Sequence, residues 1–191
     1  MENKVVVFGD VQWPFIDPKT DEAFSRFLSD FKPHILVMNG DMLDFYGLSN
    51  YAHKPSMPKA IDEINGLHEY LEAKRRLLPK AEIIYNYGNH EDRLRKFLWT
   101  KSPELDGLLR LETLLDLSSL NISHVPYYEN GAVGTSIFDY LIIHGYMARR
   151  WAGDTAKACY SRFGGNGIVG HSHRVGQFSH RDYTGNYTWF E

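Results

Sequence analysis

The sequence is poor in cysteine. Its 191 residues include only one, Cys159, so no intrachain disulfide can form and the fold does not require an oxidising compartment. The same shortage leaves no thiolate cluster to draw a metal site toward soft ions. Cys159 falls in a predicted helix away from every motif, and we interpret it as a packing residue.

Long apolar runs are absent as well. No run approaches the roughly 20 residues of a membrane-spanning helix. The first apolar run, Val5–Phe8, is too short for the hydrophobic region of a signal peptide and leads directly into Gly9-Asp10. We therefore expect a cytoplasmic protein without membrane association.

Charge of one sign is not in excess, since the formal net charge is −3 at pH 7. This balance argues against a protein that holds nucleic acid mainly by bulk charge, although it leaves room for a nuclease with a small cationic groove. No repeat, low-complexity tract or linker divides the chain, and 43% of its residues are hydrophobic, enough for a sizeable core. We expect a single globular domain spanning residues 1–191.

The sequence does contain an alternation of short apolar runs and amphipathic segments. The apolar runs predict strands at residues 4–8, 35–38, 81–85, 141–143 and 168–170, with weaker signals at 122–125 and 132–138 around turn residues Asn130-Gly131. The amphipathic segments predict helices at 17–32, 60–78, 92–99 and 153–163, with short helices between 102 and 120. Residues 175–191 predict a hairpin with its turn at 183–186.

Residues 46–59 contain prolines and glycine and predict a loop. Its aromatic residues Tyr46 and Tyr51, with Phe45 before them, are candidates for a wall against substrate. Ordinary packing is the simpler interpretation of all three.

Each of the five firmer strands ends at a residue that can bind a metal ion or move a proton. These residues are Asp10, Asp41, Asn89 with His90, His144, and His171 with His173. In an α/β protein such strand ends lie along one edge of the sheet, where ligand sites form. With Gln12 and Asp44 added, the set offers carboxylate, amide and imidazole donors, which suit borderline or hard divalent ions. It is too large for one tetrahedral ion and about sufficient for two ions that share a bridging carboxylate.

Five ordered blocks carry a resemblance to a known family: Asp10-x-Gln12, Gly40-Asp41-x-x-Asp44, Gly88-Asn89-His90-Glu91, His144-Gly145 and Gly170-His171-x-His173. In this order and at strand ends they resemble the calcineurin-like metallophosphoesterases, with small phage and bacterial members the most similar in size. The resemblance implies a four-layer α/β/β/α sandwich of two mixed sheets flanked by helices. It also implies hydrolysis of a phosphomonoester or phosphodiester by in-line attack of a hydroxide that bridges two divalent ions. Mn²⁺ is the first expectation for these ions, with Fe²⁺, Zn²⁺, Ni²⁺ or Mg²⁺ as alternatives.

The resemblance assigns roles to individual residues. The first ion would take Asp10, Gln12, Asp41 and His173, and the second would take Asp41, Asn89, His144 and His171. His90, held by Asp44, would donate a proton to the leaving oxygen or stabilise charge there. Arg93 and Arg174, together with Asn89, are the predicted substrate-binding residues, while Arg149 and Arg150 could equally be surface charges.

Gln12 departs from the family pattern, which usually has histidine there. Glutamine offers a neutral carbonyl oxygen in place of a stronger imidazole donor, so we expect a weaker first site that favours Mn²⁺ or Mg²⁺ over Zn²⁺. A hydrogen bond within the loop, with no metal ligation, is an equally good interpretation of Gln12.

Other readings stay open. A nuclease role and a catalytically silent scaffold of the same fold are the alternative functions. Glu91 and Asp92 are interpreted as acidic residues that answer the dipole of the helix they open. The histidines outside the blocks are interpreted as surface or hydrogen-bonded residues: His34, His53, His68, His124 and His180. The physiological substrate and the oligomeric state are not predicted.

Overall fold

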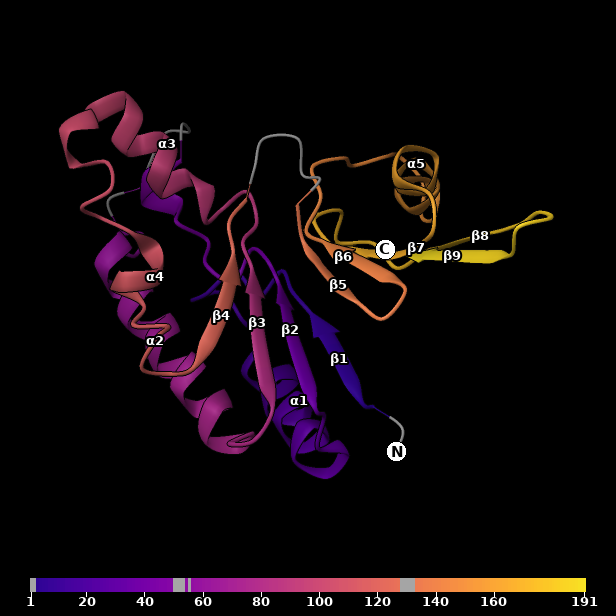
Figure 1. Ribbon diagram of the computed structural model, residues 1–191. Helices are drawn as coiled ribbons and strands as arrows, with labels where there is room; N and C mark the ends of the chain where they lie inside the picture. Colours follow the sequence, from indigo (N-terminus) through magenta and orange to yellow (C-terminus); the bar gives the residue numbers. More distant parts are fainter. Residues whose placement is uncertain (1–2, 50–53, 55, 128–132) are drawn as a thin grey trace.

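A computed structural model describes residues 3–49, 54, 56–127 and 133–191. It contains two β-sheets with helices on their outer faces (Figure 1). The first sheet has four strands, all parallel, in the order in which they occur in the chain: β1 (Val5–Phe8), β2 (Ile35–Asn39), β3 (Glu82–Asn86) and β4 (Ile122–Val125). Strands β1, β2 and β3 are the continuous apolar runs expected of parallel strands covered on both faces, whereas β4 contains Ser123 and His124 and corresponds to a weaker sequence signal.

Helices α1 (Pro18–Phe31) and α2 (Ala60–Leu77) cover one face of the first sheet. Asp17 caps α1, because its carboxylate accepts the Thr20 N–H at 2.7 Å and Pro18 occupies the first turn. The larger hydrophobic core forms where these helices meet the sheet. Shorter helices follow or precede the strands: η1 (Tyr46–Leu48), α3 (Asp92–Lys101), η2 (Pro103–Leu105) and α4 (Leu111–Leu114).

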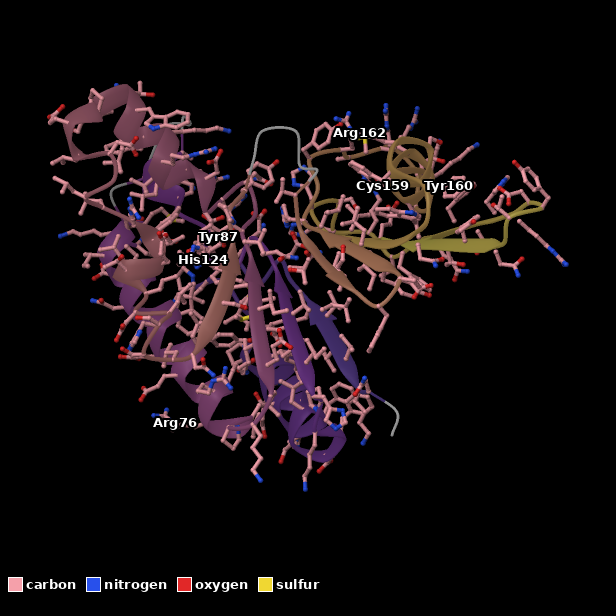
Figure 2. All side chains as sticks on the ribbon, in the orientation of Figure 1. Arg76, Tyr87, His124, Cys159, Tyr160 and Arg162 are labelled. Atoms are coloured by element: carbon pink, nitrogen blue, oxygen red, sulfur yellow. The ribbon has the colours of Figure 1, made fainter. Side chains whose placement is uncertain are left out.

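The second sheet has five strands in the order β5–β6–β7–β9–β8 and is mixed. Its strands are β5 (Thr135–Ile137), β6 (Tyr140–Ile143), β7 (Asn166–Val169), β8 (Gln177–Arg181) and β9 (Asn186–Phe190). Helix α5 (Asp154–Phe163) covers the outer face and carries Cys159 (Figure 2), which is buried in a second, smaller core with Ile143, Val169 and Trp189.

Three polar side chains join the two sheets close to the strand ends. The Asn39 amide donates to the Ile143 carbonyl at 2.8 Å, and the Asn86 amide donates to the Ile142 carbonyl at 3.1 Å. Asn86 also donates to Asn39 Oδ1 at 3.1 Å and accepts the Thr135 hydroxyl at 2.6 Å. Because these amides are buried, the bonds fix the ends of β2 and β3 against β6.

The four-layer α/β/β/α sandwich expected from the sequence is therefore present, with one difference of detail. Only the second sheet is mixed, whereas the four strands of the first are parallel throughout. The weak strand predicted at 132–138 is β5, which begins at Thr135. Tyr51, His53, Ala132 and the Asn130-Gly131 turn lie outside the described residues. None of the helices in the described ranges has the length and apolar character needed to cross a lipid bilayer.

Candidate metal centre

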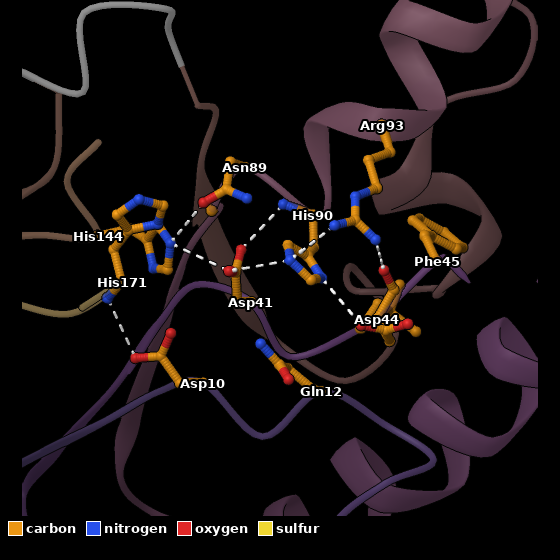
Figure 3. A network of polar contacts seen from close by, with 12 residues as sticks. Asp10, Gln12, Asp41, Asp44, Phe45, Asn89, His90, Arg93, His144 and His171 are labelled. Atoms are coloured by element: carbon orange, nitrogen blue, oxygen red, sulfur yellow. Dashed lines mark hydrogen bonds and ion pairs between the residues drawn. The ribbon is translucent and has the colours of Figure 1, made fainter. Parts of the chain in front are cut away.

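Five loops bring the predicted site residues to one place (Figure 3). The loops follow β1, β2, β3, β6 and β7, so they share the edge formed by the carboxyl ends of these strands. Six of the residues come from the first sheet and three from the second: Asp10, Gln12, Asp41, Asp44, Asn89, His90, and His144, His171, His173.

The backbone is strained at this edge. Five of these residues adopt positive φ angles between 48° and 69° although they carry side chains: Asp10, Gln12, Asp41, His171 and His173. Each such conformation costs on the order of 1–3 kcal/mol and persists where the surrounding structure over-determines it. Their concentration at one edge indicates that these loops are shaped to direct side chains inward.

Two glycines allow the loops to approach one another. A Cβ at Gly40 would lie 2.6 Å from Nδ1 of His144, and a Cβ at Gly88 would collide with the carboxylate of Asp41. Both positions therefore require glycine, because any side chain would push the loops after β2, β3 and β6 apart.

Asp41, His144 and His171 form the tightest group, with one possible ligand atom from each lying within 4.8 Å of the others. Oδ2 of Asp41 lies 3.3 Å from Nε2 of His144, which also lies 3.1 Å from Oδ1 of Asn89. Nδ1 of His144 faces the Asn39 carbonyl at 2.9 Å. That contact fixes the ring so that Nε2 points toward Asp41.

Asp10, Gln12 and His173 form the other side of the site. Oδ1 of Asp10 lies 3.3 Å from Nε2 of His173, and Oδ2 accepts the His171 N–H at 3.2 Å. The Gln12 backbone N–H donates to the Asp41 carbonyl at 2.9 Å, while its side-chain amide reaches Nε2 of His173 at 3.2 Å. The backbone of Gln12 thus holds the loop, and its side chain faces the site.

The buried charges shift one another's pKa values. Burial alone would lower the pKa of His144, but its hydrogen bond and attraction to Asp41 raise it to about 9. Burial would raise the pKa of Asp41, yet His144 and His90 hold it below its usual value. Burial raises the pKa of Asp10, and burial together with the charge of His144 lowers the pKa of His171.

The side chains gathered at this edge fit a cation. Oδ1 of Asp10 is buried and makes no hydrogen bond within the part of the chain that the structure describes, although Nε2 of His173 lies 3.3 Å away. An environment that keeps a positive charge on the buried His144 ring also favours a metal ion there, because ion and proton compete for the same nitrogen. Carboxylate, amide and imidazole donors are those that divalent ions such as Mn²⁺ accept.

His90 lies between Asp44 and Arg93. Its Nδ1 is 3.3 Å from Oδ1 of Asp44, and its Nε2 lies 2.9 Å from a guanidinium nitrogen of Arg93 and 3.6 Å from Oδ2 of Asp41. Because the guanidinium can only donate, Nε2 accepts and the ring proton is on Nδ1. Burial lowers the pKa of His90, but the contacts with Asp44 and Asp41 raise it overall.

Glu91 has a role that its position in the sequence did not indicate. It is 3% exposed, and one carboxylate oxygen accepts the backbone N–H groups of Asp41 at 2.9 Å and Gly88 at 2.7 Å. The other oxygen accepts the N–H groups of Met42 at 2.8 Å and Leu43 at 3.2 Å and the Tyr85 hydroxyl at 2.6 Å. Glu91 is therefore more than an acidic residue at a helix start, because its hydrogen bonds hold the loop that carries Asp41 in place.

The predicted arginines are placed differently. Arg93 donates to the Asp44 carbonyl at 2.6 Å and points into the site beside His90. Arg174 is exposed and donates to the Arg149 carbonyl at 2.6 Å, and it lines a surface cleft with Asp10 and His173. Arg150 lies over the ring of Trp151 at the surface.

The two-sheet fold and the cluster of possible metal ligands at one sheet edge define a class of protein. The chain belongs to the calcineurin-like phosphoesterase family, whose model matches residues 3–175. Within that class it is similar to the gene 54 protein of Mycobacterium phage D29, with 29% identity over 189 residues that cover 92% of this chain and 71% of that protein. It is also similar to the gene 54 protein of Mycobacterium phage L5, with 28% identity over 200 residues that cover 97% of this chain and 75% of that protein. Neither name states an activity.

Proposed function

We propose that the protein is a phosphoester hydrolase that uses two divalent ions, with Mn²⁺ the ion that its donors fit best. The observation that supports this most is the position of Asp41. Its carboxylate lies within 3.6 Å of imidazole nitrogens of both His144 and His90, and its backbone N–H donates to the carboxylate of Glu91. A carboxylate so placed suits a bridge between two ions.

The donors divide into two sets around that bridge. Asp10, Gln12 and His173 would hold one ion, and Asn89, His144 and His171 the other, with Asp41 shared by both. When bound, two such ions acidify a water molecule between them and offset the negative charge of the phosphate oxygens.

The remaining residues act on the substrate. Arg93 would turn from Nε2 of His90 to a phosphate oxygen, which guanidinium binds well. Nε2 of His90 would then be free to face the leaving oxygen, with Asp44 holding the ring through Nδ1. Proton donation from His90 and charge stabilisation by Arg93 would together lower the barrier to departure of the alcohol.

The proposal is tested by metal analysis of the purified protein followed by assays with p-nitrophenyl phosphate and bis(p-nitrophenyl) phosphate. We expect close to two ions per chain and turnover of one of these substrates that is lost in Asp41→Asn. A folded, metal-loaded protein that turned over neither ester would overturn the proposal in favour of a scaffold.

A nuclease is the second candidate, favoured by the exposed Arg174, which lines the cleft with Asp10 and His173, and by Arg149, whose carbonyl Arg174 contacts. A labelled single-stranded DNA assayed at low and high salt separates it from a phosphatase, because backbone binding weakens steeply with salt.

A further inference from the structure

A cavity of about 360 Å³ lies outside the metal centre, between α3 and the segment 106–112 that leads into α4. Its floor includes Tyr87, which stacks on His124 with ring centroids 5.3 Å apart (Figure 2). Glu91 is the one residue that lines this cavity and also belongs to the metal centre described above, where its carboxylate holds the loop that carries Asp41. Its volume is within the range of small-molecule sites.

Two buried side-chain atoms that line this cavity make no hydrogen bond within the described residues: the Tyr87 hydroxyl and Nε of Arg95. Oδ2 of Asp92, also in the lining, is paired with Nζ of Lys96 at 3.0 Å. Two further atoms without a hydrogen bond in the described part of the chain, on Asp10 and His90, belong to the metal centre. Because a buried polar group without a hydrogen-bond partner is destabilising, the Tyr87 and Arg95 atoms indicate a place for a ligand with polar groups.

The charges of the cavity favour an uncharged ligand. Asp92 is 4% exposed and already contacts Arg95 at 2.5 Å and Lys96 at 3.0 Å. The other lining residues include more carboxylates, on Glu91, Asp106 and Glu112, than cations, so an anion would gain little there. The guanidinium of Arg95 lies over the ring of Trp99 at 4.6 Å, which holds it in place.

The walls and the unpartnered atoms together define the ligand chemistry. Leucines 94, 98, 109 and 111 and Pro126 supply apolar surface. Nε of Arg95 can only donate a hydrogen bond, and the Tyr87 hydroxyl can donate or accept one. We propose that this cavity binds the heterocyclic base of a nucleoside, whose apolar faces and adjoining donor and acceptor groups match these walls and atoms.

Isothermal titration of adenosine, guanosine, cytidine and uridine into the Mn²⁺-loaded protein tests the proposal. Nucleosides contain no phosphoester, so their binding does not depend on the proposed hydrolysis. We expect at least one to bind at millimolar concentration or below. Binding by none of the four nucleosides would overturn the proposal.

Three variants place the binding in the cavity. Tyr87→Phe removes an unpartnered hydroxyl and should weaken nucleoside binding about tenfold while the thermal midpoint is unchanged or higher. Leu109→Trp, at the partly exposed rim, should block binding by filling the cavity. In the matched control Tyr70→Phe, outside the cavity lining, the lost hydroxyl is one that donates to Oδ1 of Asp21 at 3.1 Å, so stability should fall and nucleoside affinity should persist. Nucleoside affinity that is unchanged in both Tyr87→Phe and Leu109→Trp would show that the ligand binds elsewhere.

Discussion

At the scale of single residues, the neighbours of His90 have opposite effects on the pKa of its imidazole ring. Asp44 and Asp41 favour the charged ring, whereas Arg93 opposes it and occupies Nε2. In the proposed function, the ring would serve as a proton donor only after Arg93 had moved to the substrate, which would link proton transfer to phosphate binding.

Replacement of His90 by asparagine should leave the ions bound and reduce turnover by about 10²–10⁴-fold. The loss should be larger for phenyl phosphate than for p-nitrophenyl phosphate, because the better leaving group needs little protonation. Steady-state kinetics on both substrates provides the measurement. Equal losses would show that His90 positions the phosphate and supplies no proton.

Gln12 stands where the sequence resemblance leads us to expect histidine, and its side chain faces the site. Gln12→His should tighten the first ion and shift preference toward Zn²⁺, on the order of 10–100-fold in affinity, because imidazole is the stronger donor to borderline ions. Calorimetric titration of Mn²⁺ and Zn²⁺ measures this, with the exposed Gln177→His as control. Unchanged affinities would place position 12 outside the metal coordination.

Glu63 on α2 carries a pH dependence of its own. It is 1% exposed and accepts the Phe45 N–H at 2.6 Å, directly after Asp44, and burial raises its pKa from 4.5 to about 7. Because the pKa of Glu63 is higher in the folded than in the unfolded state, its protonation stabilises the fold. This contribution is complete below the unfolded pKa, near 4.5, and is lost as the pH rises through 7.

Glu63→Gln should therefore gain stability over the wild type between pH 5 and pH 8, on the order of 1–2 kcal/mol after allowance for partial solvation. Urea unfolding at the two pH values gives the difference. The exposed Glu69→Gln, on the same helix, is the control and should show no such trend. A gain for Glu63→Gln that is the same at both pH values would show that Glu63 does not titrate in this window.

At the scale of elements, the loop after β2 depends on the start of α3. Glu91→Gln keeps one acceptor oxygen but turns an amide group toward backbone donors, so five hydrogen bonds cannot all survive. The expected loss is about 2–4 kcal/mol of unfolding free energy, with weaker binding of the ions that Asp41 would share.

Tyr85→Phe provides a graded comparison, since it removes only one of these bonds and should cost about 1 kcal/mol. Denaturant unfolding and metal titration of both variants provide the measurement. If Glu91→Gln cost no more than Tyr85→Phe, the loop would not depend on the carboxylate.

The elements also show how far the sequence could be interpreted. The strands that end in Asp10, Asp41 and His144 were predictable because each pairs a short apolar run with a polar turn. The function of Glu91 was not, because its partners are mostly backbone N–H groups, which every residue possesses and no sequence pattern marks. The parallel order of the first sheet likewise depends on tertiary packing, and no local propensity encodes it.

At the scale of the molecule, the donors are divided between two sheets with separate hydrophobic cores. Metal ions that bind donors from both sheets stabilise the folded protein by mass action, by about 2.7 kcal/mol when the free ion is at 100 times its dissociation constant.

Chelation of the ions should therefore lower the thermal midpoint. His171→Asn should abolish most of that difference, whereas His180→Asn, at an exposed position on β8, should preserve it. Differential scanning calorimetry with and without EDTA is the measurement. A midpoint that does not respond to EDTA in the wild type would show that the ions do not bridge the sheets.

The division of the possible metal ligands between two sheets also affects how the protein unfolds locally. The core under α5 consists of few buried residues, so the second sheet depends on its attachment to the first through Asn39 and Asn86 and through any shared ion. Opening of that attachment separates the donors, and an unfolded chain keeps as local pairs only Asp10 with Gln12 and His171 with His173. Metal should therefore slow amide hydrogen exchange in β7 and β9 by more than in β2 and β3, so that ion occupancy sets the free energy at which the smaller sheet detaches.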